Sequence, residues 1–301
     1  MDEIAFRAEI EPHRRALLAL CYRMSGSWHD AEELVQEALV RAWRGFDAFE
    51  GRASIRTWLY RVTTNVCLDA LDQRRARVLP LELGPPNGAM SAPALDEPWL
   101  EPSPAWVAAE RAPDATIGAK ESVAFAFLVA LQKLPARQRA VLLLRDVVGY
   151  DAAECAHVLD MSVAAANSTL QRARETVGKP PARRAAADAD VKALLAKYIA
   201  AWENKDVDAF VSLLKEDATL AMPPFTMWFQ GAPAIGAAIS AMVFVPTRSF
   251  AFEIGEANGM PALLTRENGA PASVHVLDVD GDRIAGVMAF LDARMIDVVR
   301  G

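Results

Sequence analysis

Residues 54–77 combine, in one short segment, the side-chain types that proteins use to hold a nucleic-acid strand. Tyr60 offers an aromatic face for stacking, and Thr64 and Asn65 can hydrogen-bond the edge of a base. Phosphate contacts are available from Arg61, Arg74, Arg75 and Arg77. Apolar residues recur through the segment at helical spacing. The sequence therefore predicts a helix with a nucleic-acid-binding face.

A second polar set falls on two short helices predicted farther along the chain. Asp151 can cap the first, which covers residues 152–159, and Ser162 can cap the second, which ends near Val177. Two short helices joined by a tight turn are typical of a helix-turn-helix. The second helix carries Asn167, Gln171, Arg172 and Arg174, which are side chains that can contact bases or phosphates.

A third polar set, Glu33, Gln36 and Glu37, shares one face of a helix predicted for residues 30–43. The opposite face carries an apolar stripe of Leu34, Val35, Ala38, Leu39, Ala42 and Trp43. Taken alone, this pattern indicates an ordinary solvated helix face that bears salt bridges.

The composition predicts two or three small globular domains. The 301 residues are 52% hydrophobic, and no apolar run reaches the ~18 residues that a membrane span needs. The net charge of −7 conceals a basic block, because residues 41–78 carry eight basic and four acidic groups. Phosphate binding requires such local charge and not a basic total. The acidic N-terminus lacks an apolar targeting segment, so a cytoplasmic location is expected.

The cysteines Cys21, Cys67 and Cys155 are isolated in the sequence and odd in number. A disulfide framework and a zinc site are therefore not expected, and a reducing cytoplasm fits this pattern. All three are predicted to be small core residues. No metal and no cofactor are predicted.

The predicted fold is multidomain, with two all-α helical modules followed by an α+β domain. The expected boundaries are 1–78 and 119–178 for the modules, 79–118 for an acidic, proline-rich and mostly extended linker, 179–187 for a second linker, and 188–301 for the α+β domain. In that last domain the expected strands are 218–222, 226–230, 249–255, 262–266, 273–279 and 283–291, with a helix at 233–242 before the third.

The stretch that begins at Trp58 resembles the minus-ten recognition segment of extracytoplasmic-function sigma factors, W-L-x-R-[IV]-A-T-N-x-C-L-D. The resemblance implies a factor that binds core RNA polymerase through its β′ and β subunits and directs it to promoter DNA. The implied polymerase contacts are Glu33, Gln36, Glu37 and Arg41. The implied minus-ten contacts are Tyr60, Arg61, Thr64, Asn65, Arg74, Arg75 and Arg77. The implied minus-thirty-five contacts are Arg137, Arg139, Ala164, Ala165, Asn167, Ser168, Gln171, Arg172 and Arg174.

Residues 188–301 resemble the SnoaL-like branch of the NTF2-like cone fold, through Tyr198-Ile-Ala-Ala-Trp, Met222-Pro-Pro and Trp228. The resemblance implies a curved sheet around an apolar pocket and regulation of the sigma modules in cis, with a small ligand as one route. The candidate pocket residues are Trp202, Met222, Trp228, Phe229, His275 and Phe290. His275 and Asp278 are candidate acid–base groups, but alternation along a strand points them to opposite faces, and a satisfied strand histidine is the simpler interpretation.

Two alternatives to a sigma factor stay open at this point. One is a SnoaL-like isomerase or hydrolase that carries a DNA-binding appendage, and the other is a ligand sensor without chemistry. A one-component repressor explains the helix-turn-helix and a ligand domain. It does not explain residues 30–77.

Overall fold

The computed structural model describes residues 3–49, 51, 53–72, 74–88, 92–113, 115–178, 184 and 187–301. The chain divides into two compact units, one formed by residues 1–77 and 106–180 and the other by residues 78–105 and 181–301. No helix among the described residues is both long enough and apolar enough to cross a membrane. The predicted multidomain fold, with helical modules followed by an α+β domain, is confirmed.

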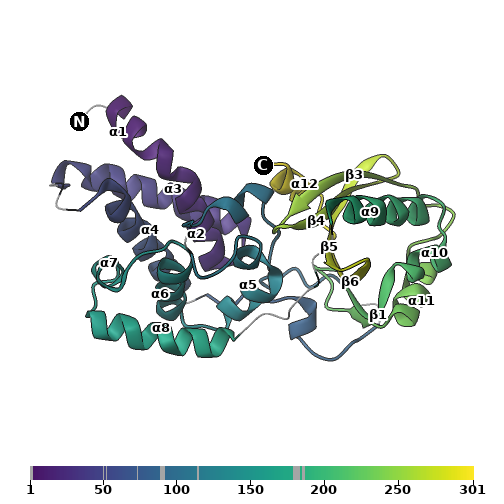
Figure 1. Ribbon diagram of the computed structural model, residues 1–301. Helices are drawn as coiled ribbons and strands as arrows, with labels where there is room; N and C mark the ends of the chain where they lie inside the picture. Colours follow the sequence, from purple (N-terminus) through teal and green to yellow (C-terminus); the bar gives the residue numbers. More distant parts are fainter. Residues whose placement is uncertain are drawn as a thin grey trace. The chain divides into compact units, whose positions relative to one another are not determined.

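The first part of the helical unit consists of α1 (Glu3–Ile10), α2 (Arg14–Ser25), α3 (Trp28–Gly45) and α4 (Ile55–Leu71) (Figure 1). Gly26 ends α2 in a left-handed conformation, with φ of 74°. Ser27 and Ser54 cap α3 and α4, because each side chain accepts a backbone N–H of the first turn. The helix predicted to reach residue 77 ends at Leu71.

The second part of the helical unit consists of α5 (Phe125–Gln132), α6 (Ala136–Asp146), α7 (Ala152–Val158) and α8 (Val163–Val177) (Figure 1). Asp151 and Glu154 form a reciprocal capping box at the start of α7. Ser162 caps α8 as predicted, and Asp160 takes a left-handed φ of 50° in the turn between the two helices. The helix-turn-helix geometry follows from these caps.

The segment 79–118 differs from the free, extended linker that the proline content suggests. Residues up to 105 belong to the compact unit of the C-terminal domain, and residues from 106 onward belong to the helical unit. Short 3-10 helices form at Pro80–Glu82 and Ala105–Ala109. Leu100 and Val107 are completely buried. Proline prevents regular structure here, but it leaves apolar side chains free to join a neighbouring core and carbonyls free to accept hydrogen bonds.

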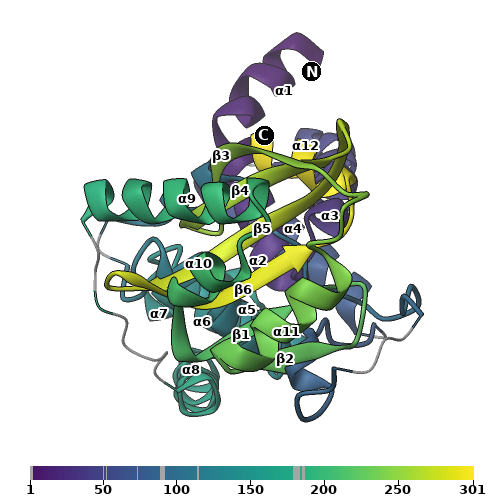
Figure 2. The same ribbon diagram turned by 90° about the vertical axis from the view of Figure 1, so that its right-hand side faces the viewer.

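The C-terminal domain is built on one mixed sheet with the strand order β2-β1-β6-β5-β4-β3. The strands are β1 (Leu214–Ala221), β2 (Trp228–Gln230), β3 (Phe250–Ala257), β4 (Met260–Glu267), β5 (Ala270–Asp280) and β6 (Arg283–Phe290). Only the β1–β6 pair is parallel among the described pairings. The helices α9 (Asp188–Glu203), α10 (Val207–Ser212) and α11 (Ala232–Met242) lie over one face (Figure 2).

A last helix, α12 (Arg294–Arg300), lies on the other face of the sheet and is absent from the sequence-based prediction. Phe252 of β3 meets Tyr198 of α9, whereas a Cβ at Gly255 of the same strand would meet Val299 of α12. Residues 252 and 255 point to opposite faces because side chains alternate along a strand. The aromatic core therefore lies between the sheet and α9–α11.

Candidate nucleic-acid and partner-binding faces

The outer face of α3 exposes Glu33, Gln36 and Glu37 together, while Leu34 and Val35 are buried. This is the division that the helical period predicts. Two of the predicted core positions differ, because Leu39 is only partly buried and Trp43 keeps 42% of its surface exposed. The face presents two carboxylates and one amide to a partner.

Arg41, the fourth residue predicted for this face, is held by intramolecular ion pairs. Its Nε lies 2.8 Å from Glu37 Oε1 and its Nη1 lies 2.7 Å from Asp69 Oδ2. These carboxylates, Asp69 first, raise the pKa of Arg41. Since Asp69 lies on α4, Arg41 joins the α3 face to the neighbouring helix.

Two of the residues predicted to touch an unpaired base, Tyr60 and Thr64, are buried inside the helical unit in this structure. Tyr60 is 4% exposed, its ring centroid lies 5.4 Å from that of Tyr150, and burial raises its pKa to about 12. Thr64 is fully buried. Both point inward because they share the helical face of Leu59 and Cys67, at spacings of one turn.

The exposed side of α4 keeps Asn65 and, partly, Arg61. Beyond the helix end, Arg75 is exposed. Arg74 and Arg77 both turn back to Asp30, with N–O distances of 2.9 and 2.6 Å. Of the predicted minus-ten arginines, these two therefore bear a charge that is already balanced.

The helix α8 presents the polar face that a major-groove reader requires. Ala164, Asn167, Ser168, Gln171 and Arg172 are exposed, and Ala165 is partly buried. Gln171 Nε2 donates to Glu175 Oε1 at 3.0 Å, and Arg172 Nη2 donates to Thr169 Oγ1 at 3.1 Å. These side-chain contacts restrain the two polar groups on the helix surface.

The remaining predicted contact, Arg174, lies on α8 but binds inward. Its Nε and Nη2 donate to Asp146 at 2.9 and 2.6 Å. Asp146 is 3% exposed, so the pair joins α8 to the end of α6, and Asp146 raises the pKa of Arg174. A bidentate pair of this kind fixes geometry more than it offers charge to DNA.

Arg139, which was predicted to reach phosphate, is buried in this structure. The side chain is 5% exposed, while Arg137, two residues earlier on α6, is exposed. Arg139 donates to the Met24 carbonyl, to Gln132 Oε1 and to the carbonyls of Gln132 and Leu134. Burial lowers its pKa to about 10, so the guanidinium stays charged at neutral pH. It joins α6 to the C-terminal end of α2.

Two further arginines, which the sequence analysis did not single out, bind the parts of the helical unit together. Arg23 of α2 is 2% exposed and donates to the carbonyls of Val107, Glu110 and Ser122 at 2.8 to 3.2 Å. Arg56 of α4 donates to the Val148 carbonyl at 3.1 Å. A signal for Arg23 existed, because it falls within the apolar stripe of its helix. The two helical modules are thus docked on each other.

The residues predicted to line a ligand pocket in the C-terminal domain are all buried. Trp202, Met222 and Phe229 belong to its central hydrophobic cluster, and Phe290 is 3% exposed. The indole of Trp202 is surrounded by Tyr198, Phe210, Phe244, Phe250 and Phe252 at centroid distances of 5.1 to 6.1 Å. Aromatic rings fill the concave side at this point.

His275 is hydrogen-bonded on both nitrogens. Nδ1 lies 3.1 Å from the Tyr198 hydroxyl and Nε2 lies 3.1 Å from Ser273 Oγ. Burial lowers its pKa to about 4, so the ring is neutral. The simpler interpretation of a satisfied strand histidine fits this environment.

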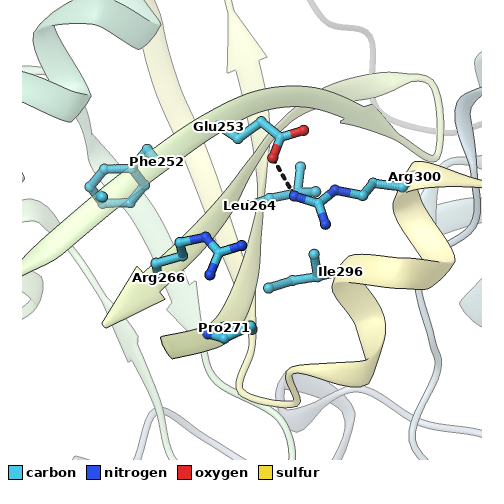
Figure 3. Close-up of a pocket in the computed structure, with 8 residues that line it drawn as sticks. Phe252, Glu253, Leu264, Arg266, Pro271, Ile296 and Arg300 are labelled. Atoms are coloured by element: carbon cyan, nitrogen blue, oxygen red, sulfur yellow. Dashed lines mark hydrogen bonds and ion pairs between the residues drawn. The ribbon is translucent and has the colours of Figure 1, made fainter. Parts of the chain in front are cut away.

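A shallow hollow of about 110 Å³ occurs on the opposite face, between β3, β4 and α12 (Figure 3). Leu264, Ile296 and Pro271 form its apolar wall, while Arg266 and Arg300 stand at its edge. Arg300 pairs with Glu253. None of the predicted pocket residues contributes to this hollow.

The residues 78–105 are held by the C-terminal domain through main-chain and side-chain contacts. Trp228 Nε1 donates to the Gly84 carbonyl at 3.0 Å, and the Ala94 N–H donates to the Pro224 carbonyl at 2.8 Å. Asn258 Oδ1 accepts the N–H of Ser103 at 2.9 Å. Trp228 therefore has a structural partner outside the predicted pocket.

Comparison with known proteins gives these faces a context. Residues 10–77 match the family Sigma-70 region 2, and residues 124–177 match Sigma-70, region 4. The chain is 44% identical to the ECF RNA polymerase sigma factor SigG of Mycobacterium tuberculosis over 309 aligned residues, which cover 96% of this chain and 82% of that protein. It is 32% identical to SigJ of the same organism, over 70% of this chain and 63% of SigJ. The crystal structure of SigJ shares the fold, with a TM-score of 0.60 at 22% identity over 97% of this chain and 98% of that one.

Proposed function

This chain belongs to the extracytoplasmic-function family of RNA polymerase sigma factors, whose function is promoter-specific initiation with RNA polymerase, and we propose which of its faces make the contacts. The α3 face of Glu33, Gln36 and Glu37 binds core polymerase. Asn65, Arg61 and Arg75 meet the minus-ten strand, and the exposed face of α8 meets the minus-thirty-five duplex. The observation that carries this proposal is that α3, α4 and α8 each leave polar side chains exposed on one face.

The two modules must separate to act together on DNA. The two promoter elements lie about 25 base pairs apart, or about 85 Å of B-DNA at ~3.4 Å per pair. A compact unit of 152 residues, the sum of 77 and 75 from the two stretches, has a radius of gyration of about 15 Å. The docked form held by Arg23, Arg56 and Arg139 is therefore a state off the promoter.

The C-terminal domain modulates this separation in cis through its hold on residues 78–105. A released segment of these 28 residues spans up to about 95 Å. While Asn258 and Trp228 hold it, that length is not available to let the modules move apart. A small ligand that loosened the hold would act in the same direction.

The alternative of an isomerase or hydrolase has less support. Its acid–base chemistry needs a group that can exchange a proton with substrate. Both nitrogens of His275 are occupied within the domain, and its neighbours are aromatic. The alternative of a ligand sensor is compatible with the sigma assignment, because regulation in cis needs binding and not turnover.

The polymerase contact is tested by size-exclusion chromatography of the full chain with bacterial core RNA polymerase. The substitution Glu33→Arg should abolish co-elution, because it places a cation on an acidic face. Glu216→Arg is the matched control, since Glu216 is an exposed glutamate of β1. Equal co-elution of both variants would contradict the proposed face.

The hold on residues 78–105 has its own matched pair of variants. Asn258 and Asn268 both take left-handed conformations, with φ of 54° and 49°, which glycine adopts readily. Only the first accepts a hydrogen bond from Ser103, whereas Asn268 contacts Ser249. Asn258→Gly should increase the fraction of chain bound to polymerase at a fixed concentration, and Asn268→Gly should not. No difference between the two would contradict regulation by this hold.

A further inference from the structure

Two thiols that are far apart in sequence meet inside the helical unit. The sulfur of Cys67 on α4 lies 3.6 Å from the sulfur of Cys21 on α2, and both side chains are completely buried. The third cysteine, Cys155, is buried on α7. The sequence predicted three separate core residues, so the fold creates a pair that spacing did not reveal.

The guanidinium of Arg139 is anchored one helical turn from this pair, because it donates to the carbonyl of Met24 on α2. Burial lowers the pKa of Arg139, and the charge of Cys67 acts on it in the opposite direction. The Nε of Arg139 has no hydrogen-bond partner among the described residues. The thiolate is the reactive form of cysteine. Burial raises the pKa of Cys21, which suits it to act second.

We propose that Cys21 and Cys67 are a modification site, at which a hydroperoxide oxidises the two thiols to a reversible disulfide between α2 and α4. The geometry carries this, because two sulfurs in contact need a displacement of only about 1.5 Å to reach the bonded distance of ~2.05 Å. Access of peroxide comes from local opening of the unit.

The chemistry balances with one peroxide for each disulfide. The Cys67 thiolate attacks one oxygen of hydrogen peroxide, the O–O bond breaks, Cys67 becomes a sulfenic acid, and the departing hydroxide takes up the proton that the Cys67 thiol had lost and becomes the first water. The Cys21 sulfur then attacks the sulfenic sulfur, the S–O bond breaks, and hydroxide leaves and takes up the Cys21 proton as a second water. Two electrons pass from the sulfurs to the peroxide oxygens.

The disulfide would lie directly beneath the contact between the two modules. Met24, three residues after Cys21, provides the carbonyl that accepts from Arg139, and Asn65 lies two residues before Cys67. Drawing α2 and α4 together therefore alters both the docking contact and the presentation of α4. This consequence rests on the proposed function, whereas the oxidation itself does not.

The test uses the full chain, hydrogen peroxide and mass spectrometry. After treatment the chain is unfolded, alkylated with N-ethylmaleimide and weighed. The reduced protein contains three cysteines and takes three adducts. We expect the oxidised protein to take one adduct, at Cys155, to lack two hydrogen atoms, and to yield a linked peptide pair of Cys21 and Cys67. Dithiothreitol should restore three adducts.

Two variants keep the result interpretable if one of them folds poorly. Cys155→Ser should still form the disulfide, and Cys21→Ala should not, with circular dichroism reporting helix content for each. Closing this loop should raise the thermal transition by roughly 5–15 °C in the oxidised wild type. Three adducts at every peroxide concentration, a link that includes Cys155, or added oxygen without a link would overturn the proposal. These readouts need neither DNA nor polymerase, so they stay independent of the sigma function.

Discussion

The helical unit and the C-terminal domain each bury a basic side chain, and they do so in opposite charge states. Arg139 is 5% exposed and stays cationic, with four protein acceptors around it. His275 is 3% exposed and is neutral, between two hydroxyl groups. A guanidinium cannot discard its proton when it is buried, whereas an imidazole can. The helical unit therefore retains a desolvated charge at the contact between its modules, and the C-terminal domain retains none at the centre of its core.

This difference suits the two roles. A buried charge costs desolvation energy that its partners must offset, so a contact built on it is easier to exchange for water than an apolar one. In the proposed function the docked modules part on the promoter, and Arg23 then exchanges the carbonyls of Val107, Glu110 and Ser122 for water, while Arg139 exchanges that of Met24. Opening the core around Trp202 and His275 rehydrates no buried charge and is therefore only unfavourable. The comparison predicts that the domain core outlasts the docking contact under denaturing conditions.

The largest expected effect comes from Arg139→Met. The substitution removes the donor but leaves the carbonyls of Met24, Gln132 and Leu134 unpaired in the interior. We expect the helical unit to lose about 3–5 kcal/mol, which lowers its thermal transition by about 10 °C. Calorimetry measures this. Arg137→Met, on the exposed side of the same helix, should change stability by less than about 0.5 kcal/mol. Equal losses of stability in the two variants would contradict the idea that the buried arginine stabilises the unit more than the exposed one.

The next effect is a pH dependence that belongs to His275. Its pKa is about 4 in the folded chain and about 6.5 when unfolded. Between these values the unfolded chain holds a proton that the folded chain does not, so stability falls as pH falls through this window. The contribution is about 3 kcal/mol across it. Urea titrations of wild type and His275→Gln at pH 7 and pH 4.5 measure the change. The variant should start less stable but lose less on acidification, and a parallel loss in both would assign the dependence to other groups.

Much of the fold followed from the sequence, because its signals were local. The caps Asp151 and Ser162 marked two helix starts, and alternation marked the approximate positions of the strands. The features that the sequence did not predict share one physical cause. Tyr60, Thr64 and Arg139 carry side-chain types that suit DNA, and their burial depends on helices that lie far away in sequence. Likewise, the prolines of 79–118 exclude regular structure without showing that Leu100 enters a core.

The contact between Cys21 and Cys67 was equally inaccessible to spacing arguments. Forty-six residues separate the two positions, and only the packing of α2 on α4 brings them together. The predicted ligand pocket rests on a related ambiguity. Aromatic residues at Trp202 and Phe229 are consistent either with a pocket wall or with a filled core, and the number of neighbouring rings decides between them.

A smaller effect should follow from Arg174→Gln, which tests a guanidinium of intermediate burial. Arg174 is about half exposed while its partner Asp146 is 4% exposed. Removing the bidentate pair should cost about 1–2 kcal/mol, chiefly because the aspartate is left without its cation. Asp146→Asn and the double variant complete a cycle that isolates the coupling between the two residues. A coupling energy near zero would mean that Asp146 does not hold Arg174, which would then stay a candidate DNA contact.

The smallest effect on stability is expected at Arg172. In contrast to Arg139, this residue is expected to affect DNA binding and not stability. Arg172 is exposed on α8, so Arg172→Ala should leave the thermal transition unchanged. Its effect should appear on DNA. Each lost phosphate contact lowers the slope of log Kd against log salt by about 1. Fluorescence anisotropy with a 30-base-pair duplex (about 100 Å) measures this. Lys192→Ala, an exposed cation of α9, is the control and should leave the slope unchanged. If the slopes of both variants stayed at the wild-type value, α8 would not be the face that meets the duplex. Arg172 would then differ from Arg139 only in its exposure to solvent and not in DNA binding.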